Sequence, residues 1–132
     1  MEQTLVLIKG DGVRRRLMGE IIRRIESKGL DIREMRLMDV SRELAQEHYS
    51  EHREKPFFAE LVEFITATPV VAMRVEGEGA IKVMRRLMGS TNPAEANPGT
   101  IRGDFALSLP DNLVHGSDSA ESAGKELGLF FG

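Results

Sequence analysis

Cysteine is absent from this chain of 132 residues. Without a thiol, the chain cannot form disulfides, bind a metal through thiolates or use a cysteine nucleophile. Long apolar runs are missing as well, because residues 5–8 (LVLI) are the only continuously apolar stretch before Lys9. A run of this length is too short for a signal peptide or a membrane span. We therefore expect a soluble, cytoplasmic protein with no membrane partner.

An excess of positive charge is also lacking. The chain has 18 Lys and Arg against 21 Asp and Glu, which gives a formal net charge of −3. This balance argues against non-specific nucleic-acid binding as the main role, and no specific nucleic acid is expected. Any phosphate site must then be a local cluster of cations. The length fits one domain, residues 1–132, with a single core of ordinary size.

The hydrophobic pattern predicts strands that alternate with helices. Residues 4–8 and 70–73 are apolar runs typical of strands buried on both faces, and residues 30–40 alternate loosely as another strand. Apolar residues at helical spacing predict helices over residues 17–28, 77–87 and 121–129, a shorter helix over residues 41–48, and one that Pro56 opens in its first turn. Gly29 is the expected stop of the first of these helices, and Ser41 is the expected N-cap of the shorter one. The order favours an α/β sandwich whose helices cover one face of a mixed sheet.

Two stretches interrupt this pattern and are candidates for function. Residues 9–12 (KGDG) predict a turn forced by two glycines, where Lys9 is a candidate phosphate ligand although the order of residues is not that of a Walker loop. Residues 89–111 are rich in Gly, Pro and Asn, and a loop of this length inside a compact domain is usually functional. Because Thr91 and Arg102 lie in it and Arg85 precedes it, we expect a polyphosphate site.

The stretch NLVHGSDS at residues 112–119 holds the main candidate for chemistry. His115 follows an apolar pair, and Gly116 tolerates the backbone angles of a sharp turn. Residues 117–119 supply candidate N-caps for the next helix. Glu126 lies on that helix, where its carboxylate could orient one imidazole nitrogen and leave the other free as a nucleophile. A purely structural histidine is the alternative interpretation.

A second histidine pattern favours a different function. Residues 48–52 (HYSEH) match the H-x-x-E-H pattern of inverted zinc peptidases. On a helix, His48 and His52 would share one face, as zinc ligands require. A zinc hydrolase using these two residues is therefore an alternative function, although the chain leaves little room for a third ligand and a substrate cleft. A solvated helix is the simpler interpretation.

Seven motifs follow one another along the chain. They are KGDGV (residues 9–13), EHY (47–49), KPFF (55–58), PVVAM (69–73), TNPA (91–94), PGTIRGDF (98–105) and NLVHGSDS (112–119). In this order they resemble the nucleoside diphosphate kinases, over essentially the whole chain. The resemblance implies an α+β fold, namely a ferredoxin-like βαββαβ sandwich with helices packed on a four-stranded sheet and a long loop before the last strand.

The same resemblance implies an enzyme that transfers the γ-phosphoryl group from a nucleoside triphosphate to a nucleoside diphosphate in two steps, with broad base specificity. Mg²⁺ would be the cofactor, carried by the nucleotide phosphates without a metal cage made by the protein. The partners would be nucleoside di- and triphosphates and further copies of the chain, in a hexamer or tetramer.

The resemblance also implies roles for individual residues. The catalytic residues would be His115 as the phosphorylated nucleophile, Glu126 as the group that orients its ring, and Ser117, Tyr49 and Lys9 close by. The nucleotide would contact Lys9 and Asn112 through its ribose, Arg85, Thr91 and Arg102 through its phosphates, and Phe57 with Leu61 through its base.

The chain departs from the pattern of the family at a few positions. Gly10 stands where the family has Pro, Arg16 where it usually has Gly, and Pro110 with Asp111 where it has a Gly-Arg pair. Asp111 thus places an anion beside the expected phosphate site. These changes motivate a second alternative, a catalytically weak nucleotide-binding scaffold of the same fold. Since the chain ends at Gly132 without the extension of longer members, we expect fewer contacts between subunits.

Overall fold

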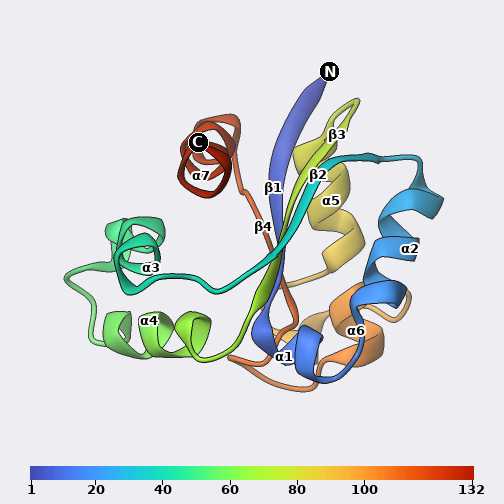
Figure 1. Ribbon diagram of the computed structural model, residues 1–132. Coiled ribbons are helices and arrows are strands. Elements are labelled where there is room, and N and C mark those ends of the chain that lie inside the picture. The colour runs from blue at the N-terminus through green and yellow to red at the C-terminus, as the bar shows by residue number, and fades with distance from the viewer.

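The computed structural model describes residues 1–132, in which four strands form one antiparallel sheet (Figure 1). β1 (Glu2–Ile8) pairs with β3 (Val70–Gly77) on one side and with β4 (Val114–Gly116) on the other, and β2 (Asp31–Met38) lies at the edge beyond β3. The strand order β2-β3-β1-β4 is that of the ferredoxin-like fold. β1 and β2 run in the same direction, but β3 lies between them, so every pair of neighbouring strands is antiparallel. The prediction of a mixed sheet is therefore wrong.

Helices cover both faces of this sheet, so the prediction of one covered face is also wrong. In Figure 1, α2, α5 and α6 lie on one side of the strands and α3, α4 and α7 on the other. No helix is both long enough and apolar enough to cross a membrane. The helices are α1 (Gly10–Arg14), α2 (Met18–Lys28), α3 (Arg42–His48), α4 (Phe58–Thr66), α5 (Ala80–Met88), α6 (Ile101–Phe105) and α7 (Ala120–Phe131), with 3-10 turns η1 (Ser50–His52) and η2 (Pro93–Glu95).

The central strand β1 contributes to two apolar cores. Val6 and Ile8 belong to the core shared with α2 and α5, whereas Leu5 and Leu7 belong to the core shared with α3, α4 and α7. Successive side chains of a strand point to opposite faces. Because both faces are covered, every residue from 4 to 8 is buried. This confirms the prediction of a strand buried on both faces.

The segment after β1 forms helix α1 instead of a glycine turn. Its first backbone hydrogen bond reaches the carbonyl of Lys9 at 3.1 Å, and neither Gly10 nor Gly12 has a positive φ. The glycines provide space for close packing. A Cβ on Gly12 would lie 2.8 Å from Cγ2 of Ile8, and a Cβ on Gly10 would lie 1.8 Å from Oγ1 of Thr68.

Several helix ends follow the predicted capping residues. Ser41 caps α3, where its hydroxyl accepts a hydrogen bond from a backbone N–H at 3.1 Å. Gly29 ends α2 in the left-handed region with a φ of 101°. Of the three candidates before α7, Ser119 provides the cap through its hydroxyl. These local signals placed the helix limits to within about two residues, as expected for helix boundaries.

Other predicted boundaries are displaced. α4 begins at Phe58, so Pro56 precedes the cap of this helix instead of lying in its first turn. β3 continues to Gly77, and α5 therefore begins only at Ala80. The long loop expected over residues 89–111 contains two short helical elements, η2 and α6. Arg16 has a φ of 62°, which accounts for the glycine that the family usually has at this position.

Candidate functional site

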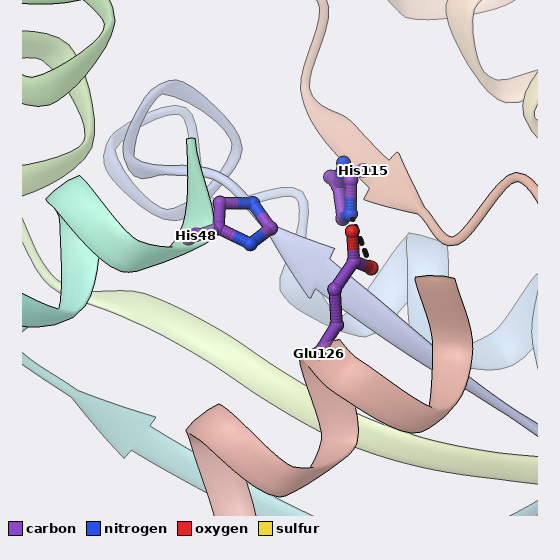
Figure 2. Close-up of side chains that lie close together, drawn as sticks. All are labelled: His48, His115 and Glu126. Carbon is purple, nitrogen blue, oxygen red and sulfur yellow. Dashed lines mark hydrogen bonds and ion pairs between the residues drawn. The ribbon is translucent and has the colours of Figure 1, made fainter. Parts of the chain in front are cut away.

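His115 lies in the middle of β4, and its ring faces the carboxylate of Glu126 on α7 (Figure 2). Nε2 of His115 is 3.0 Å from Oε1 of Glu126. The hydroxyl of Ser117 donates to the same oxygen at 2.7 Å and accepts a bond from the backbone N–H of Leu5 at 3.3 Å. The imidazole is thus held by Glu126 of α7, which Ser117 supports from the segment after β4.

This geometry determines which nitrogen of His115 is free. When Nε2–H donates to Glu126, the neutral ring keeps its lone pair on Nδ1. Burial alone would raise the pKa of Glu126, but the hydrogen bond and charge of His115 and the hydrogen bond from Ser117 outweigh burial and lower this pKa below its ordinary value. Glu126 is therefore an ionised acceptor, and the arrangement suits a nucleophilic Nδ1.

The backbone is unusual immediately before β4, at Leu113, which has a φ of 73°. Its N–H donates to the carboxylate of Asp11 at 3.0 Å, and its carbonyl accepts from the backbone N–H of Lys9 at 2.8 Å. The prediction of a turn at Gly116 is wrong, because this residue belongs to β4. A Cβ there would lie 2.9 Å from Cε of Met88, so the missing side chain serves close packing.

Lys9 and Asn112 form one wall of the site. Nζ of Lys9 donates to Oδ1 of Asn112 at 2.7 Å and to the carbonyl of Pro110 at 3.0 Å. The amide of Asn112 donates to the carbonyl of Thr91 at 2.9 Å. Burial lowers the pKa of Lys9 to about 8, although nearby carboxylates, among them that of Asp111, act in the opposite direction. The anion of Asp111 thus helps to keep Lys9 protonated.

Arg102 is buried beneath the site and holds three backbone carbonyls from two segments of the chain. Its guanidinium donates to the carbonyls of Gly89 at 2.9 Å, Asn112 at 3.2 Å and Val114 at 2.7 Å. Burial, with a smaller effect of the Arg85 charge, lowers its pKa to about 10. Since a guanidinium has five N–H groups, two remain for another partner. Arg102 therefore combines a structural role with a cationic group in the lining of the cleft.

A cleft of about 290 Å³ brings most of the predicted residues together. Ser117 lies behind its wall and reaches it through Glu126. Phe57 is not part of the lining. It lies in an adjoining apolar groove that shares Leu61 and Pro110 with the cleft, and it is 43% exposed. The predicted residues that line the cleft are Lys9, Tyr49, Leu61, Arg85, Thr91, Arg102, Asn112, His115 and Glu126.

His48 and Tyr49 close the cleft at the end of α3. The ring centroid of His48 lies 4.8 Å from that of His115 and 4.7 Å from that of Tyr49. Burial, followed by the charge of His115, lowers the pKa of His48 to about 3. Burial, together with the charge of Glu126, raises the pKa of Tyr49 to about 12. Near neutral pH, His48 is uncharged and Tyr49 keeps its hydroxyl proton.

The structure does not support the helical pairing of His48 with His52. α3 ends at His48, whereas His52 ends the separate turn η1, so the two side chains do not share a helical face and this basis for a zinc hydrolase is wrong. His48 instead approaches His115 and Glu126. The sequence does not predict this contact, although His48 belongs to the EHY motif.

Asp118 is a further residue of the cleft that the sequence did not predict. From the sequence, it is one of three candidate caps for the helix that became α7. A signal for Asp118 is nevertheless present in the sequence, because α7 needs only one capping side chain. Ser119 provides this cap, and the Asp118 carboxylate stays exposed at the cleft. Its pKa is lowered, mainly by hydrogen bonding to Ser122. Asp118 therefore adds a negative charge to the lining of the cleft.

Sequence comparison places this geometry in a known context. The family model described as "Nucleoside diphosphate kinase" matches residues 2–132. A nucleoside diphosphate kinase of Rubrobacter xylanophilus is 79% identical over 132 residues, which cover 100% of this chain and 99% of that protein. One from Exiguobacterium sibiricum is 63% identical over 131 residues, which cover 99% and 95% of the two chains.

Solved structures agree with this similarity. A halophilic nucleoside diphosphate kinase from Halobacterium salinarum in complex with CDP superposes with a TM-score of 0.96 at 49% identity, covering 98% of this chain and 87% of that one. A nucleoside diphosphate kinase family protein from Babesia bovis has a TM-score of 0.97 at 46% identity, covering 99% and 88%. The similarity therefore extends over the whole sheet and the cleft.

Proposed function

We propose that His115 carries the phosphoryl group, since this chain belongs to the nucleoside diphosphate kinase family and transfers γ-phosphoryl groups between nucleotides by a ping-pong mechanism. The observation that supports this assignment is the 3.0 Å contact between Nε2 of His115 and Glu126, which leaves Nδ1 as the nitrogen with a lone pair. No other histidine of the cleft is paired with a carboxylate in this way.

Two half-reactions follow from this arrangement. Nδ1 of His115 attacks the γ-phosphorus of the triphosphate, the bond from phosphorus to its bridging oxygen breaks, and the nucleoside diphosphate leaves. A terminal oxygen of a second nucleoside diphosphate then attacks the phosphorus, and the phosphorus–nitrogen bond breaks. Through both steps the proton on Nε2 stays with the ring, where the charge of Glu126 stabilises the positive phosphorylated imidazole.

The cations of the cleft would position the phosphates. Arg85 lies beside β4, where it donates to the carbonyl of Gly116 at 3.1 Å, and Arg102 has two N–H groups to spare. Guanidinium groups match the geometry of phosphate oxygens and stabilise the charge on a transferring phosphoryl group. We assign Thr91 to the same task and Tyr49, with its protonated hydroxyl, to a hydrogen bond near the phosphoryl group.

The nucleoside would lie between the cleft and the adjoining groove. We assign Lys9 and Asn112, which contact each other at 2.7 Å, to the ribose hydroxyls. The groove offers the exposed ring of Phe57 and the side chain of Leu61 to the base. Stacking recognises the π-face that every base has, so this binding mode gives broad base specificity.

Kinases of this family generally need a divalent cation, and we propose Mg²⁺. Besides Glu126, which is engaged with His115 and Ser117, the carboxylates of the lining are Glu51 and Asp118. Such separate carboxylates do not build a cage, but they fit a Mg²⁺ that arrives on phosphate oxygens and keeps part of its water shell. When bound, this cation neutralises charge that develops on the phosphates.

We further propose that residues 1–132 form one domain, since a single sheet carries both cores. A homo-oligomer, either a hexamer or a tetramer, is supported by exposed apolar side chains on β2 and before β4, namely Met35, Leu37, Leu107 and Leu109. Because nucleoside triphosphates are used inside the cell, we propose a cytoplasmic location.

The decisive experiment replaces the nucleophile. We expect His115→Ala to lower phosphoryl transfer by about 10⁴-fold or more, because removal of a nucleophile leaves only binding and charge stabilisation. Nucleotide binding should be retained, since the cations and Phe57 remain. Incubation with ATP and detection of an acid-labile phosphoryl adduct measures the step directly.

The wild-type chain is the control in this experiment. Turnover by His115→Ala would show that another residue carries the group. Absence of an adduct on folded wild-type chain, with nucleotide still bound, would favour the catalytically weak scaffold.

A further inference from the structure

Two imidazoles and a carboxylate converge at the floor of the cleft. One donor atom from each of His48, His115 and Glu126 lies within 4.8 Å of the other two. Figure 2 shows the three side chains reaching toward one another from α3, β4 and α7. Phosphoryl transfer uses the pair of His115 and Glu126 but gives no role to His48.

The composition of this cluster matches a metal site. Two histidines and one glutamate, with water as a fourth ligand, form a common tetrahedral zinc site, in which bonds of about 2.0–2.1 Å separate neighbouring ligand atoms by about 3.3 Å. Nε2 of His115 and Oε1 of Glu126 are already 3.0 Å apart. The bond from Ser117 holds this carboxylate in place, as supporting contacts do for metal ligands.

His48 is available as the third ligand. Its side chain is 6% exposed, lines the cleft and has a buried Nδ1 without any hydrogen-bond partner. Its ring meets that of His115 edge-on, with centroids 4.8 Å apart and planes at 81°. A buried polar atom without a partner is costly in free energy. A metal ion bound by the His48 imidazole would give this side chain a bonding partner.

We propose that His48, His115 and Glu126 bind one divalent transition-metal ion, such as Zn²⁺, and that this ion blocks phosphorylation of His115. The nitrogen ligands favour zinc, nickel or copper over Mg²⁺, which prefers oxygen. The proposed site therefore differs in its ligand atoms from the site of the Mg²⁺ that the nucleotide carries.

Inhibition follows from the tautomer of His115, and this consequence rests on the proposed role of that residue. A neutral imidazole has one proton. Coordination of the metal by the Nε2 lone pair moves this proton to Nδ1, so the nitrogen assigned to attack phosphorus no longer has a free lone pair. At the same time Glu126 becomes a metal ligand and no longer stabilises the positive ring.

The binding test uses the full chain without nucleotide. Equilibrium dialysis against Zn²⁺ in the presence of excess Mg²⁺ should give one zinc per chain. Loss of a contact that merely supports a metal ligand costs about 10–100-fold in affinity, so loss of a ligand in His48→Gln should weaken binding by at least about tenfold. His52→Gln is the matched control, because His52 lines the same cleft outside the cluster, and it should bind zinc like wild type.

Equal zinc binding by His48→Gln and wild type would overturn the site. So would equal weakening by His48→Gln and His52→Gln, which would indicate a different pair of ligands. A measurement on wild type alone avoids dependence on the folding of a variant. In its NMR spectrum, Zn²⁺ should shift the ring signals of His48 and His115 and leave those of His52 in place, and the reverse pattern would contradict the proposal.

Activity separates this proposal from the assignment of His115. With zinc held by a metal buffer, we expect phosphohistidine formation from MgATP to fall at least tenfold relative to the zinc-free reaction in wild type and His52→Gln, and to fall less in His48→Gln. Zinc bound at the cluster without inhibition would overturn the proposed block and the role of Nδ1. Absence of zinc binding, with transfer still abolished in His115→Ala, would remove the metal site alone.

Discussion

One carboxylate oxygen links stability to chemistry in this molecule. Oε1 of Glu126 accepts hydrogen bonds from both His115 and Ser117, at 3.0 and 2.7 Å. These bonds and the charge of His115 lower the pKa of Glu126 despite its burial. The oxygen that would orient the nucleophile therefore also helps to dock α7 on the sheet.

The lowered pKa predicts how the stability contributed by Glu126 depends on pH. A carboxylate with a pKa below its ordinary value of 4.5 stabilises the fold above pH 4.5, and this contribution is lost as the pH falls through the folded-state value. We expect Glu126→Gln to be less stable than wild type at neutral pH, because the neutral amide lacks the charge. The difference should shrink as the pH drops below 4.5.

Urea unfolding of the two proteins at a series of pH values measures this difference. Ser117→Ala is a useful control, because it removes one hydrogen bond to Glu126 and keeps the ionisable carboxylate. A stability gap between wild type and Glu126→Gln that stayed constant or widened toward acid pH would contradict the assignment of Glu126 as an ionised acceptor.

At the scale of elements, Thr68 explains why this chain has glycine where the family has proline. Gly10 is the first residue of α1, a position that proline favours because its N–H has no helical partner. Here Oγ1 of Thr68 lies 1.8 Å from the place of a Cβ on Gly10. The hydroxyl occupies the space that a proline ring would need.

This packing predicts coupling between the two positions. Gly10→Pro alone should destabilise the chain through the clash with Thr68. With Thr68→Ala also present, proline should stabilise the chain by about 0.4–1 kcal/mol relative to Thr68→Ala alone, because it restricts the unfolded state. Denaturant unfolding of the four proteins in the cycle gives both differences. Equal effects of the proline in the two backgrounds would show that Thr68 is not the obstacle.

Elements with local signals were predictable from the sequence. The helix expected over residues 17–28 is Met18–Lys28, and its glycine stop is confirmed. The contact of His115 with Glu126 was also within reach, since a strand, a turn and one helix connect them. The segment at residues 9–12 was not, because its helix depends on packing against residues that are far away in the sequence.

Contacts that site residues make across the fold could not be predicted from the sequence for the same reason. Arg102 was expected to serve phosphates, yet it also holds carbonyls of Gly89, Asn112 and Val114. His48 was paired with the nearby His52 because a motif suggests neighbours along a helix. No periodic pattern reports contacts between a short helix and a strand, so these partners became visible only in three dimensions.

At the scale of the whole molecule, the edge strand β2 stands out. Met35 and Leu37 lie on one face of this strand and are 56% and 62% exposed. An open edge strand with apolar side chains is a surface that natural proteins usually cover. Substitutions on β2 can therefore test the proposed homo-oligomer.

We expect Leu37→Arg to reduce the mass of the assembly measured by light scattering, because a charge on β2 would be buried between subunits. The protomer should stay folded, since Leu37 is largely exposed within it. Ala120→Arg adds the same charge at an exposed position on α7 and should leave the mass unchanged. An unaltered mass for Leu37→Arg would exclude β2 from the subunit contact.

The pairing of β1 with β4 has a consequence for the synthesis of the enzyme on the ribosome. Leu5 and Ser117 share a hydrogen bond although 112 positions separate them, and Glu126 follows later still. The ribosome therefore delivers Lys9 early and Glu126, the partner of the proposed nucleophile, late. A nascent chain interrupted before α7 has no carboxylate beside its imidazole, so prematurely terminated translation products should lack phosphoryl-transfer activity.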